Sequence, residues 1–206
     1  YFRDEESWKS PEQLIQILVD GVSLGGNLLM NVGPTGRGTF DQRAIASLEV
    51  YGKWLRLHGR AIYGAGRADF VPPDGVRYTQ KGNRLYAHIY NWPNQYLLLD
   101  GLRGKVKYAQ LLNDASEVQW PADDADTHFM PPGAEHTLTL LLPVKKPDVV
   151  VPVIELILKD GPDDDHSPRA PEPPHVAPRS TKHDAALPLA AADGQQADTA
   201  QFRALG

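Results

Sequence analysis

Residues 25–34, with the sequence GGNLLMNVGP, constrain the fold of this chain more than any other stretch. The run at 28–32 is apolar on both faces, which is typical of a parallel strand covered on both sides rather than an antiparallel strand with one face in water. Gly25 and Gly26 precede the run, and Gly33 and Pro34 end it. Because one parallel strand is not a sheet, its neighbours must come from elsewhere, and the chain offers no second such unit.

Helical patterns lie on both sides of this predicted strand. Ser10 is placed to cap the first helix, Pro11 suits its first turn, and Gln13 can reach back to the cap. Four apolar residues then recur at helical spacing before Gly25, namely Leu14, Ile17, Leu18 and Val22. A second helix is predicted over residues 41–58, with Gly59 past its end and an apolar stripe of Ile45, Leu48 and Leu55. The predicted order is helix, buried strand, helix.

The pattern changes in residues 67–159, where apolar and polar positions alternate and turn signals recur at short intervals. A hairpin is predicted around Gly82 and Asn83, with His88 on its polar face and Leu85, Ala87 and Ile89 on its apolar face. Short strands separated by polar turns predict a small antiparallel β-sandwich. The candidate strands are residues 76–81, 84–91, 95–99, 105–112, 117–120, 137–142 and 153–158.

Residues 160–206 have a different composition, with seven prolines, many alanines and charged residues, and Phe202 as the only aromatic residue. Such a segment buries too little apolar surface to offset the cost of chain ordering. We predict a disordered linker or tail. A proline-rich peptide ligand is the functional alternative, and it lacks a clean repeated motif here.

Composition excludes several classes of function. The net charge of −5 argues against a nucleic-acid partner, since phosphate binding requires a basic face. The chain has no cysteine, which excludes disulfides and thiolate chemistry, and no apolar run long enough to span a membrane. Its first residue is Tyr1 rather than methionine, so we expect a chain that has been cut or truncated.

Local patterns that resemble active sites have simpler explanations. Ser23 lies in a G-x-S-x-G motif, the pattern of a nucleophile elbow. That elbow requires a strand before the serine and a helix after it, whereas here the predicted helix precedes Ser23 and the predicted strand follows. The loop at 33–38 lacks the lysine of a phosphate-binding loop. The histidines show no metal-ligand spacing, so neither a metal nor a cofactor is predicted. Three acidic groups are interpreted as solvated charges: Asp4, Glu5 and Glu6; Asp123, Asp124 and Asp126; and Asp163, Asp164 and Asp165.

Four aromatic residues gather around one turn of the predicted sandwich: Tyr86, Tyr90, Trp92 and Tyr96. Exposed aromatic faces can stack on sugar rings, which would make this a lectin-like site. A packed edge or an interface with a neighbouring domain is the interpretation that we favour.

Four blocks of this sequence occur in an order and spacing that resemble a known family. They are WKSPEQLI at 8–15, GGNLLMNVGP at 25–34, GKWL at 52–55 and AIYG at 61–64. Together they resemble consecutive blocks of the α-L-fucosidases of glycoside hydrolase family 29, over residues 1–66. Residues 67–159 are similar to that family's C-terminal domain in position and strand pattern, without a motif of their own.

The resemblance implies a retaining exo-hydrolase that removes terminal α-L-fucose from oligosaccharides or glycoconjugates, with no cofactor. It also implies an aspartate nucleophile and a glutamate acid/base on a (β/α)8-type barrel, both located before Tyr1. The expected fold is therefore an α/β remnant, the last helix-strand-helix of the barrel (1–66), followed by an antiparallel β-sandwich (67–159) and a disordered tail (160–206). The family suggests a secreted, periplasmic or lysosomal location.

No catalytic residue is carried over onto this chain by the resemblance. Tyr1 matches a tyrosine that closely follows a sugar-contacting aromatic, and Asn31 and Thr35 are expected to support the sugar site from the barrel rim. The alternative is that Asn31, like Asn27, satisfies backbone groups at a strand end. Relatives often carry an acidic residue where this chain has Arg37.

Two classes of function remain open on the sequence. The chain is either the C-terminal part of a fucosidase, inactive alone, or a sandwich that works independently as a carbohydrate-binding or interaction module. We favour the first, because a sandwich that folds and functions alone would gain nothing from carrying barrel elements whose apolar faces are exposed to water.

Overall fold

In the computed structural model, which describes residues 8–121 and 134–159, helix α1 spans Pro11–Ser23 and begins as the sequence predicts. The Gln13 N–H donates to Ser10 Oγ at 3.2 Å, and the Ser10 N–H donates to Gln13 Oε1 at 2.9 Å. This reciprocal capping box satisfies two backbone donors at the helix start. The helix ends at Ser23, and Gly25 follows the C-cap residue Leu24 with a φ of 82°, which suits a residue without a Cβ.

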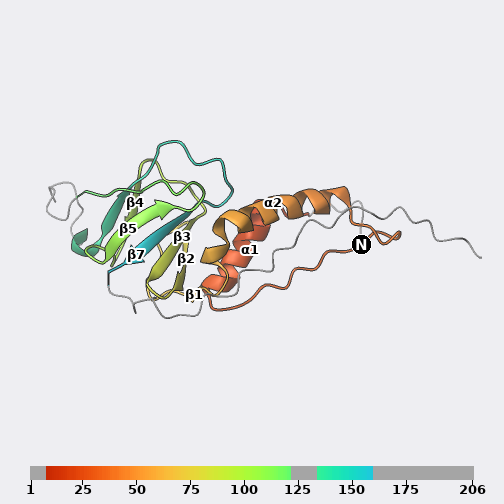
Figure 1. The fold of residues 1–206 in the computed structure, drawn as a ribbon, viewed down its shortest axis with the longest axis horizontal. Coiled ribbons are helices and arrows are strands. Elements are labelled where there is room, and N and C mark those ends of the chain that lie inside the picture. The colour runs from red at the N-terminus through yellow and green to blue at the C-terminus, as the bar shows by residue number, and fades with distance from the viewer. Residues whose placement is uncertain (1–7, 122–133, 160–206) are drawn as a thin grey trace, which may run out of the picture. The chain divides into compact units, whose positions relative to one another are not determined.

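Helix α2 spans Gln42–His58, and the short 3-10 helix η1, Gly59–Ala61, follows it directly. Asp41 caps α2, since its Oδ1 accepts a hydrogen bond from the Arg43 N–H at 2.9 Å. Figure 1 shows α1 and α2 side by side next to the strands. Both predicted helices are confirmed to within a residue at their ends.

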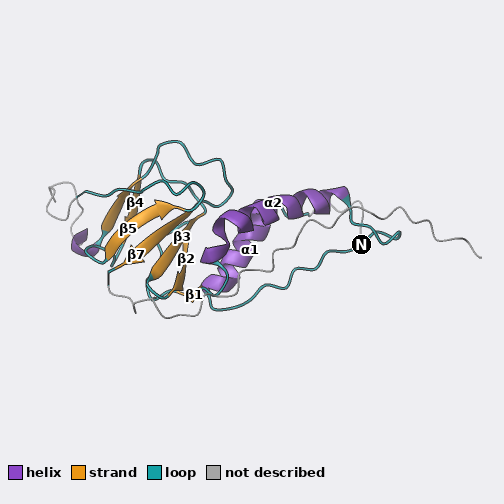
Figure 2. Ribbon diagram, viewed as in Figure 1, coloured by secondary structure: helices purple, strands orange, loops and turns teal. Residues whose placement is uncertain are grey.

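The described strands form two antiparallel sheets (Figure 2). The larger sheet has the order β1-β2-β3-β7-β5, and the smaller pairs β4 with β6. The predicted hairpin is confirmed as β2 and β3, with Lys81 opposite Arg84. The strand bounds are β1 Gly66–Arg67, β2 Val76–Lys81, β3 Arg84–Ile89, β4 Tyr96–Leu99, β5 Val106–Leu111, β6 Leu138–Leu141 and β7 Val153–Leu158, and a 3-10 turn, η3, spans Ala134–His136.

The larger sheet is buried on both faces. One face shares an apolar core with the smaller sheet, to which β3 contributes Leu85, Ala87 and Ile89 as predicted. The other face packs against the helices in a second core, which includes Tyr86 of β3 and Val153 of β7.

The prediction that His88 lies on a polar face is wrong, because His88 is fully buried. Alternation along β3 is real, but the face opposite the apolar core is covered by helices instead of water. His88 therefore lies in the layer between the sheet and α2, where its ring is 6.2 Å from that of Trp54.

Helix α1 is also tied to the sheet by a polar contact. Asp20 Oδ1 accepts hydrogen bonds from Arg77 Nε and from the Tyr90 hydroxyl, each at 2.9 Å. The same Tyr90 hydroxyl lies 3.1 Å from the carbonyl oxygen of Gln16, one turn earlier on the helix. These contacts fix α1 against β2 and the end of β3, so the helix pair and the sheet form one packed unit.

The buried strand predicted at 28–32 is not formed. Residues 28–32 make no ladder with any described strand, and Leu29 is 95% exposed. A parallel strand needs hydrogen-bonded neighbours on both sides, and every strand pair in the described residues is antiparallel. Leu28 packs partly against the second core, but Leu29 has no covering strand or helix among the residues that the structure describes.

The helices present a second apolar stripe that the sheet does not cover. The sheet-facing side of α1 buries Ile15, Val19 and Val22, whereas Ile17 is 38% exposed. On α2 the buried residues are Ala44, Trp54 and His58, and the predicted stripe of Ile45, Leu48 and Leu55 is only half-buried. Each helix therefore has apolar residues on more than the one side that packs here.

The candidate strand at 117–120 is not formed as a continuous strand. It is reduced to isolated bridges, Gln110 with Glu117 and Gln119 with Leu141. The tail predicted at 160–206 lies outside the described residues, as do all three groups of acidic residues. Within the part of the chain that is described, no helix is long and apolar enough to cross a membrane.

The lack of a strand at 28–32 predicts fast hydrogen exchange in this segment. We expect the amides of residues 28–32 to exchange at nearly the rate of an unstructured peptide, because no ladder protects them. The amides of β3 and β7, each flanked by two strands, should exchange orders of magnitude more slowly. Site-resolved exchange measured by NMR tests this, and comparable protection in the two regions would contradict the fold.

Candidate functional site

The segment predicted to support a sugar site is exposed. Asn31 is exposed and lies outside any helix or strand, and Tyr1 falls outside the described residues. Thr35 belongs to a small hairpin closed by a bridge between Pro34 and Phe40. The role of Tyr1, Asn31 and Thr35 near substrate therefore stays a prediction.

The hydroxyl of Thr35 is engaged within its own hairpin. Its Oγ1 lies 2.8 Å from Thr39 Oγ1, and the Thr35 N–H donates to the Thr39 carbonyl oxygen at 2.7 Å. The Gly38 N–H in turn donates to the Thr35 carbonyl oxygen at 2.9 Å. These bonds hold the loop that carries Arg37 in a defined shape at the surface.

The four aromatic residues around the sandwich turn do not form a shared platform. Tyr86 is buried in the core beneath the helices, and the Trp92 Nε1–H donates to the Pro143 carbonyl oxygen at 3.0 Å. Tyr90 contacts α1 through its hydroxyl, and Tyr96 is exposed on β4. Three of the four residues are thus held by packing or hydrogen bonds at different places, as on a packed edge, and Tyr96 is exposed.

Within residues 8–121 and 134–159, the buried carboxylate is that of Glu155, on β7. Its Oε1 accepts a hydrogen bond from Arg84 at 2.8 Å, and its Oε2 accepts from Gln110 at 2.7 Å and lies 3.0 Å from Arg60. Both arginines are about half exposed, so their charges stay partly hydrated. A carboxylate compensated this fully is a structural ion pair and not a free general acid or base.

A second buried polar cluster joins α2, η1 and the sheet. The Thr79 hydroxyl donates to the Ala61 carbonyl oxygen at 2.6 Å, so it accepts from His88 Nε2 at 2.9 Å. His58 Nδ1 donates to the Trp54 carbonyl oxygen at 3.0 Å. These bonds assign both tautomers and leave His58 Nε2 and His88 Nδ1 as acceptors with no partner among the described residues.

Burial keeps both histidines neutral. It lowers the pKa of His58 to about 4, an effect that the hydrogen bond to the Trp54 carbonyl oxygen opposes and the charge of Arg60 reinforces. It lowers the pKa of His88 to about 3, with a further contribution from the nearby His58. A neutral His58 ring stacked on Trp54, with the neutral His88 ring tilted beside it, is consistent with a structural role in holding α2 on the sheet.

No group of three or more metal-ligating side chains occurs in the described residues. The carboxylate of Glu155 is occupied by ion pairs, and that of Asp20 by Arg77 and Tyr90, so neither is available as the free acid or base that a retaining glycosidase requires.

The chain is similar in sequence and in structure to proteins of one family. The family model of the α-L-fucosidases matches residues 1–60. An α-L-fucosidase of Branchiostoma floridae is 37% identical over 116 residues, which are 54% of this chain and 26% of that relative. The structure of α-L-fucosidase isoenzyme 1 of Paenibacillus thiaminolyticus matches with a TM-score of 0.69 at 38% identity, over 78% of this chain and 37% of that one.

This chain is a partial homologue of the α-L-fucosidases. A family 29 α-L-fucosidase of Bacteroides thetaiotaomicron, solved as a covalent intermediate with 2-fluoro-fucosyl fluoride, matches 74% of this chain and 33% of its own, with a TM-score of 0.62 and 28% identity. The resemblance predicted from the four sequence blocks is confirmed, and the family is one of glycoside hydrolases. The chain spans between about a quarter and two fifths of these relatives.

Sequence reasoning missed the buried polar clusters of this α-L-fucosidase homologue. His88 and Glu155 both lie on the helix-facing side of the sheet, which strand alternation alone assigns to water. The useful signal was in β7, whose sequence VIELIL is apolar at every position but one. An antiparallel strand with that pattern is covered on both faces, which marks any polar residue on it as buried and paired.

The lowered pKa values predict that acid destabilises the fold. Between pH 6.5 and pH 4, His58 and His88 become protonated in the unfolded chain but stay neutral in the folded chain. Folding stability therefore falls as the pH drops through this range, by about 1 kcal/mol per pH unit for each histidine. Urea unfolding at pH 7 and pH 5.5 measures this loss.

Two variants make the pH test specific. His58→Gln removes one titrating group and should reduce the dependence on pH, whereas His136→Gln, at an exposed position, should leave it unchanged. Equal stability of the parent chain at the two pH values would contradict the assigned neutral state.

The ion pairs of Glu155 predict a stability cost for its neutralisation. Glu155→Gln keeps the shape but loses the charge that Arg60 and Arg84 contact, and we expect a loss of about 1–3 kcal/mol in the free energy of unfolding. Glu117→Gln, at an exposed site, should change it by less than about 0.5 kcal/mol. Urea denaturation compares the two, and an equal effect would refute the structural role of Glu155.

Proposed function

We propose that this chain is the C-terminal portion of an exo-acting, retaining α-L-fucosidase that hydrolyses terminal α-L-fucose from oligosaccharides or glycoconjugates. Residues 1–66 supply the last elements of the catalytic barrel, residues 67–159 form the β-sandwich that follows, and residues 160–206 form a tail. The nucleophile and the acid/base belong to the part of the enzyme that precedes Tyr1. Alone, the chain is inactive.

The observation that carries this proposal is the apolar run at 28–32, which pairs with no strand among the described residues. It lies within the part that matches the α-L-fucosidase family model, and its Leu29 is 95% exposed. Burial of such a segment between neighbouring parallel strands accounts for its composition. The uncovered stripe of the helices, represented by Ile17, supports the same assembly, since helices of an α/β barrel pack against its strands.

In the assembled enzyme, the hairpin that holds Thr35 and Arg37 follows the strand formed by residues 28–32. Barrel enzymes place their active sites at the ends of strands on that side, so Asn31 and Thr35 support the sugar site indirectly. The hydrogen bonds between Thr35 and Thr39 hold the loop in one shape, so the loop can position residues that contact the sugar without contacting the sugar itself.

Activity in a chimaeric enzyme tests the proposal. Residues 1–159 replace the matching part of the Paenibacillus thiaminolyticus α-L-fucosidase, and hydrolysis of 4-nitrophenyl α-L-fucoside is measured. We expect turnover by the chimaera and none by this chain alone. Turnover by the isolated chain that survives repurification would overturn the proposal.

A pair of matched substitutions at exposed apolar residues sharpens the test. Leu29→Asp should leave the isolated chain folded, because Leu29 is exposed there, but should abolish chimaera activity by placing a charge in the closed barrel. Val71→Asp, at a residue that is 83% exposed, should leave the chimaera active. If Leu29→Asp has no effect on the chimaera, residues 28–32 do not form a barrel strand.

A further inference from the structure

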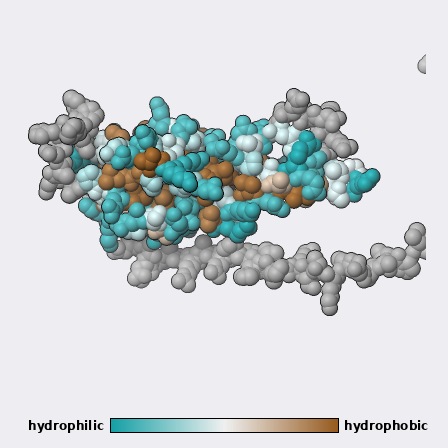
Figure 3. All heavy atoms as spheres, turned by 90° about the horizontal axis from the view of Figure 1, so that it is seen from above, coloured by the Kyte–Doolittle hydropathy of each residue, from teal (hydrophilic) through white to brown (hydrophobic). Residues whose placement is uncertain are grey.

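A groove of about 820 Å³ lies between helix α2 and the loop that joins β6 to β7. Helix α2 lines it with Val50, Lys53, Trp54 and Leu57, whose spacing of three and four residues places them on one stripe. The loop contributes residues 145–150. The volume falls in the range of small-molecule sites. In Figure 3, seen from above, hydrophobic surface over the sheet and along the helices lies between hydrophilic side chains.

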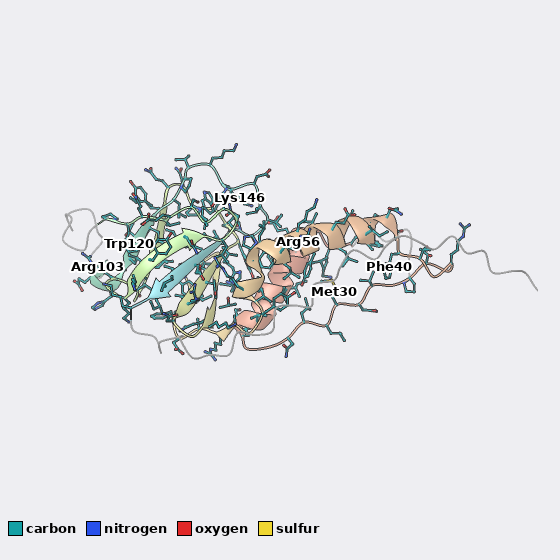
Figure 4. The ribbon with its side chains drawn as sticks, in the orientation of Figure 1. Met30, Phe40, Arg56, Arg103, Trp120 and Lys146 are labelled. Carbon is teal, nitrogen blue, oxygen red and sulfur yellow. The ribbon has the colours of Figure 1, made fainter. Side chains whose placement is uncertain are left out.

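The charged residues of this groove are mostly basic, although the chain as a whole is acidic. Lys53, Lys145 and Lys146 line it, against the single carboxylate of Asp148, in a protein of net charge −5. Figure 4 labels Lys146 on the loop and Arg56 on the facing helix. A local excess of ammonium groups beside an apolar lining attracts anions that also carry apolar surface.

The loop side of the groove ends in a strained residue. Val151 is buried and has a φ of 43°, a conformation that a β-branched residue rarely adopts and that costs about 1–3 kcal/mol. Its carbonyl oxygen accepts a hydrogen bond from Trp54 Nε1 at 3.0 Å, which ties the end of the loop to helix α2. This buried bond fixes Trp54, one of the lining residues, relative to the loop, and such preorganisation favours binding.

We propose that this groove binds a small amphipathic anion, an apolar ring system that carries one sulfonate, sulfate or carboxylate group. The acidic group contacts the ammonium groups of Lys145, Lys146 and Lys53, and the ring lies on Val50, Leu57 and the valines of the loop. The site is separate from the fucosidase chemistry proposed above and does not depend on it.

The dimensions favour a small ligand over a peptide or a nucleic acid. The stripe from Val50 to Leu57 is about 10 Å long, at 1.5 Å rise per residue, which matches a fused ring with one substituent. Lysine ammonium groups bind anions as point charges and impose no bidentate geometry, so the apolar walls select the ligand by its shape. An extended polyanion would require a longer basic surface.

Binding to the intact chain tests the proposal without any assay of hydrolysis. Naphthalene-2-sulfonate is titrated into the isotopically labelled chain, and the indole N–H resonance of Trp54 is followed by NMR, with naphthalene-2-sulfonamide as the neutral control of the same shape. We expect saturable binding of the sulfonate, at least fivefold weaker binding of the sulfonamide, and weaker binding of the sulfonate in high salt.

Three variants locate the site. Lys145→Gln with Lys146→Gln, and separately Lys53→Gln, should each weaken sulfonate binding at least threefold, while Lys159→Gln, at an exposed lysine beyond β7, should leave it unchanged. All four side chains are exposed, so folding is preserved and is checked by circular dichroism. Equal binding of sulfonate and sulfonamide, equal effects of Lys159→Gln and the groove variants, or no saturable binding would each overturn the proposal.

Discussion

The larger sheet has no face in water, and most of the structure depends on this constraint. The smaller sheet covers one face, and α1, α2 and η1 cover the other. Polar residues on the helix-facing side must then find partners locally, since water does not reach them. The Thr79 hydroxyl donates a hydrogen bond to the Ala61 carbonyl oxygen, and Glu155 forms ion pairs with Arg60 and Arg84. These buried polar residues therefore lie where the helices contact the sheet.

The helices meet a different constraint on their other side. Ile17 of α1 stays exposed, and so does Leu29 in the connection between α1 and α2. An ordinary surface helix has one apolar side. Both helices therefore keep apolar surface that no described residue covers, and the chain matches only part of the length of its relatives.

Local sequence signals predicted the elements whose causes are local. The capping residues Ser10 and Gln13, the hairpin turn at Gly82 and Asn83, and the alternation along β3 each involve contacts between near neighbours, and each element formed as expected. The strand at 28–32 failed because strand formation depends on partners far away in the sequence. His88 was misplaced for the same reason, since no residue of β3 reveals that a helix covers it.

The candidate site was predictable to a smaller extent. The family resemblance was sufficient to expect that no catalytic carboxylate lies in this chain, and the described carboxylates that are buried or paired serve as structural ion pairs. The role of Asn31 and Thr35 near a sugar stays a prediction, because their short-range sequence context does not say what surrounds them. The groove beside α2 could not be predicted for a different reason. Its two sides come from segments far apart in the sequence, as the 97 residues between Trp54 and Val151 show.

The packing of the helix pair on the sheet has a consequence for how homologues of this chain can be recombined. Gly66, where β1 begins, separates the helices from the strands in the sequence but not in the packing, because α1 and α2 share the second core with Tyr86 and Val153 of the sheet. If the strands alone were exchanged between two homologues at that point, Tyr86, His88 and Glu155 would face the helices of the other protein. An exchange that moves α1 and α2 together with the strands keeps these contacts.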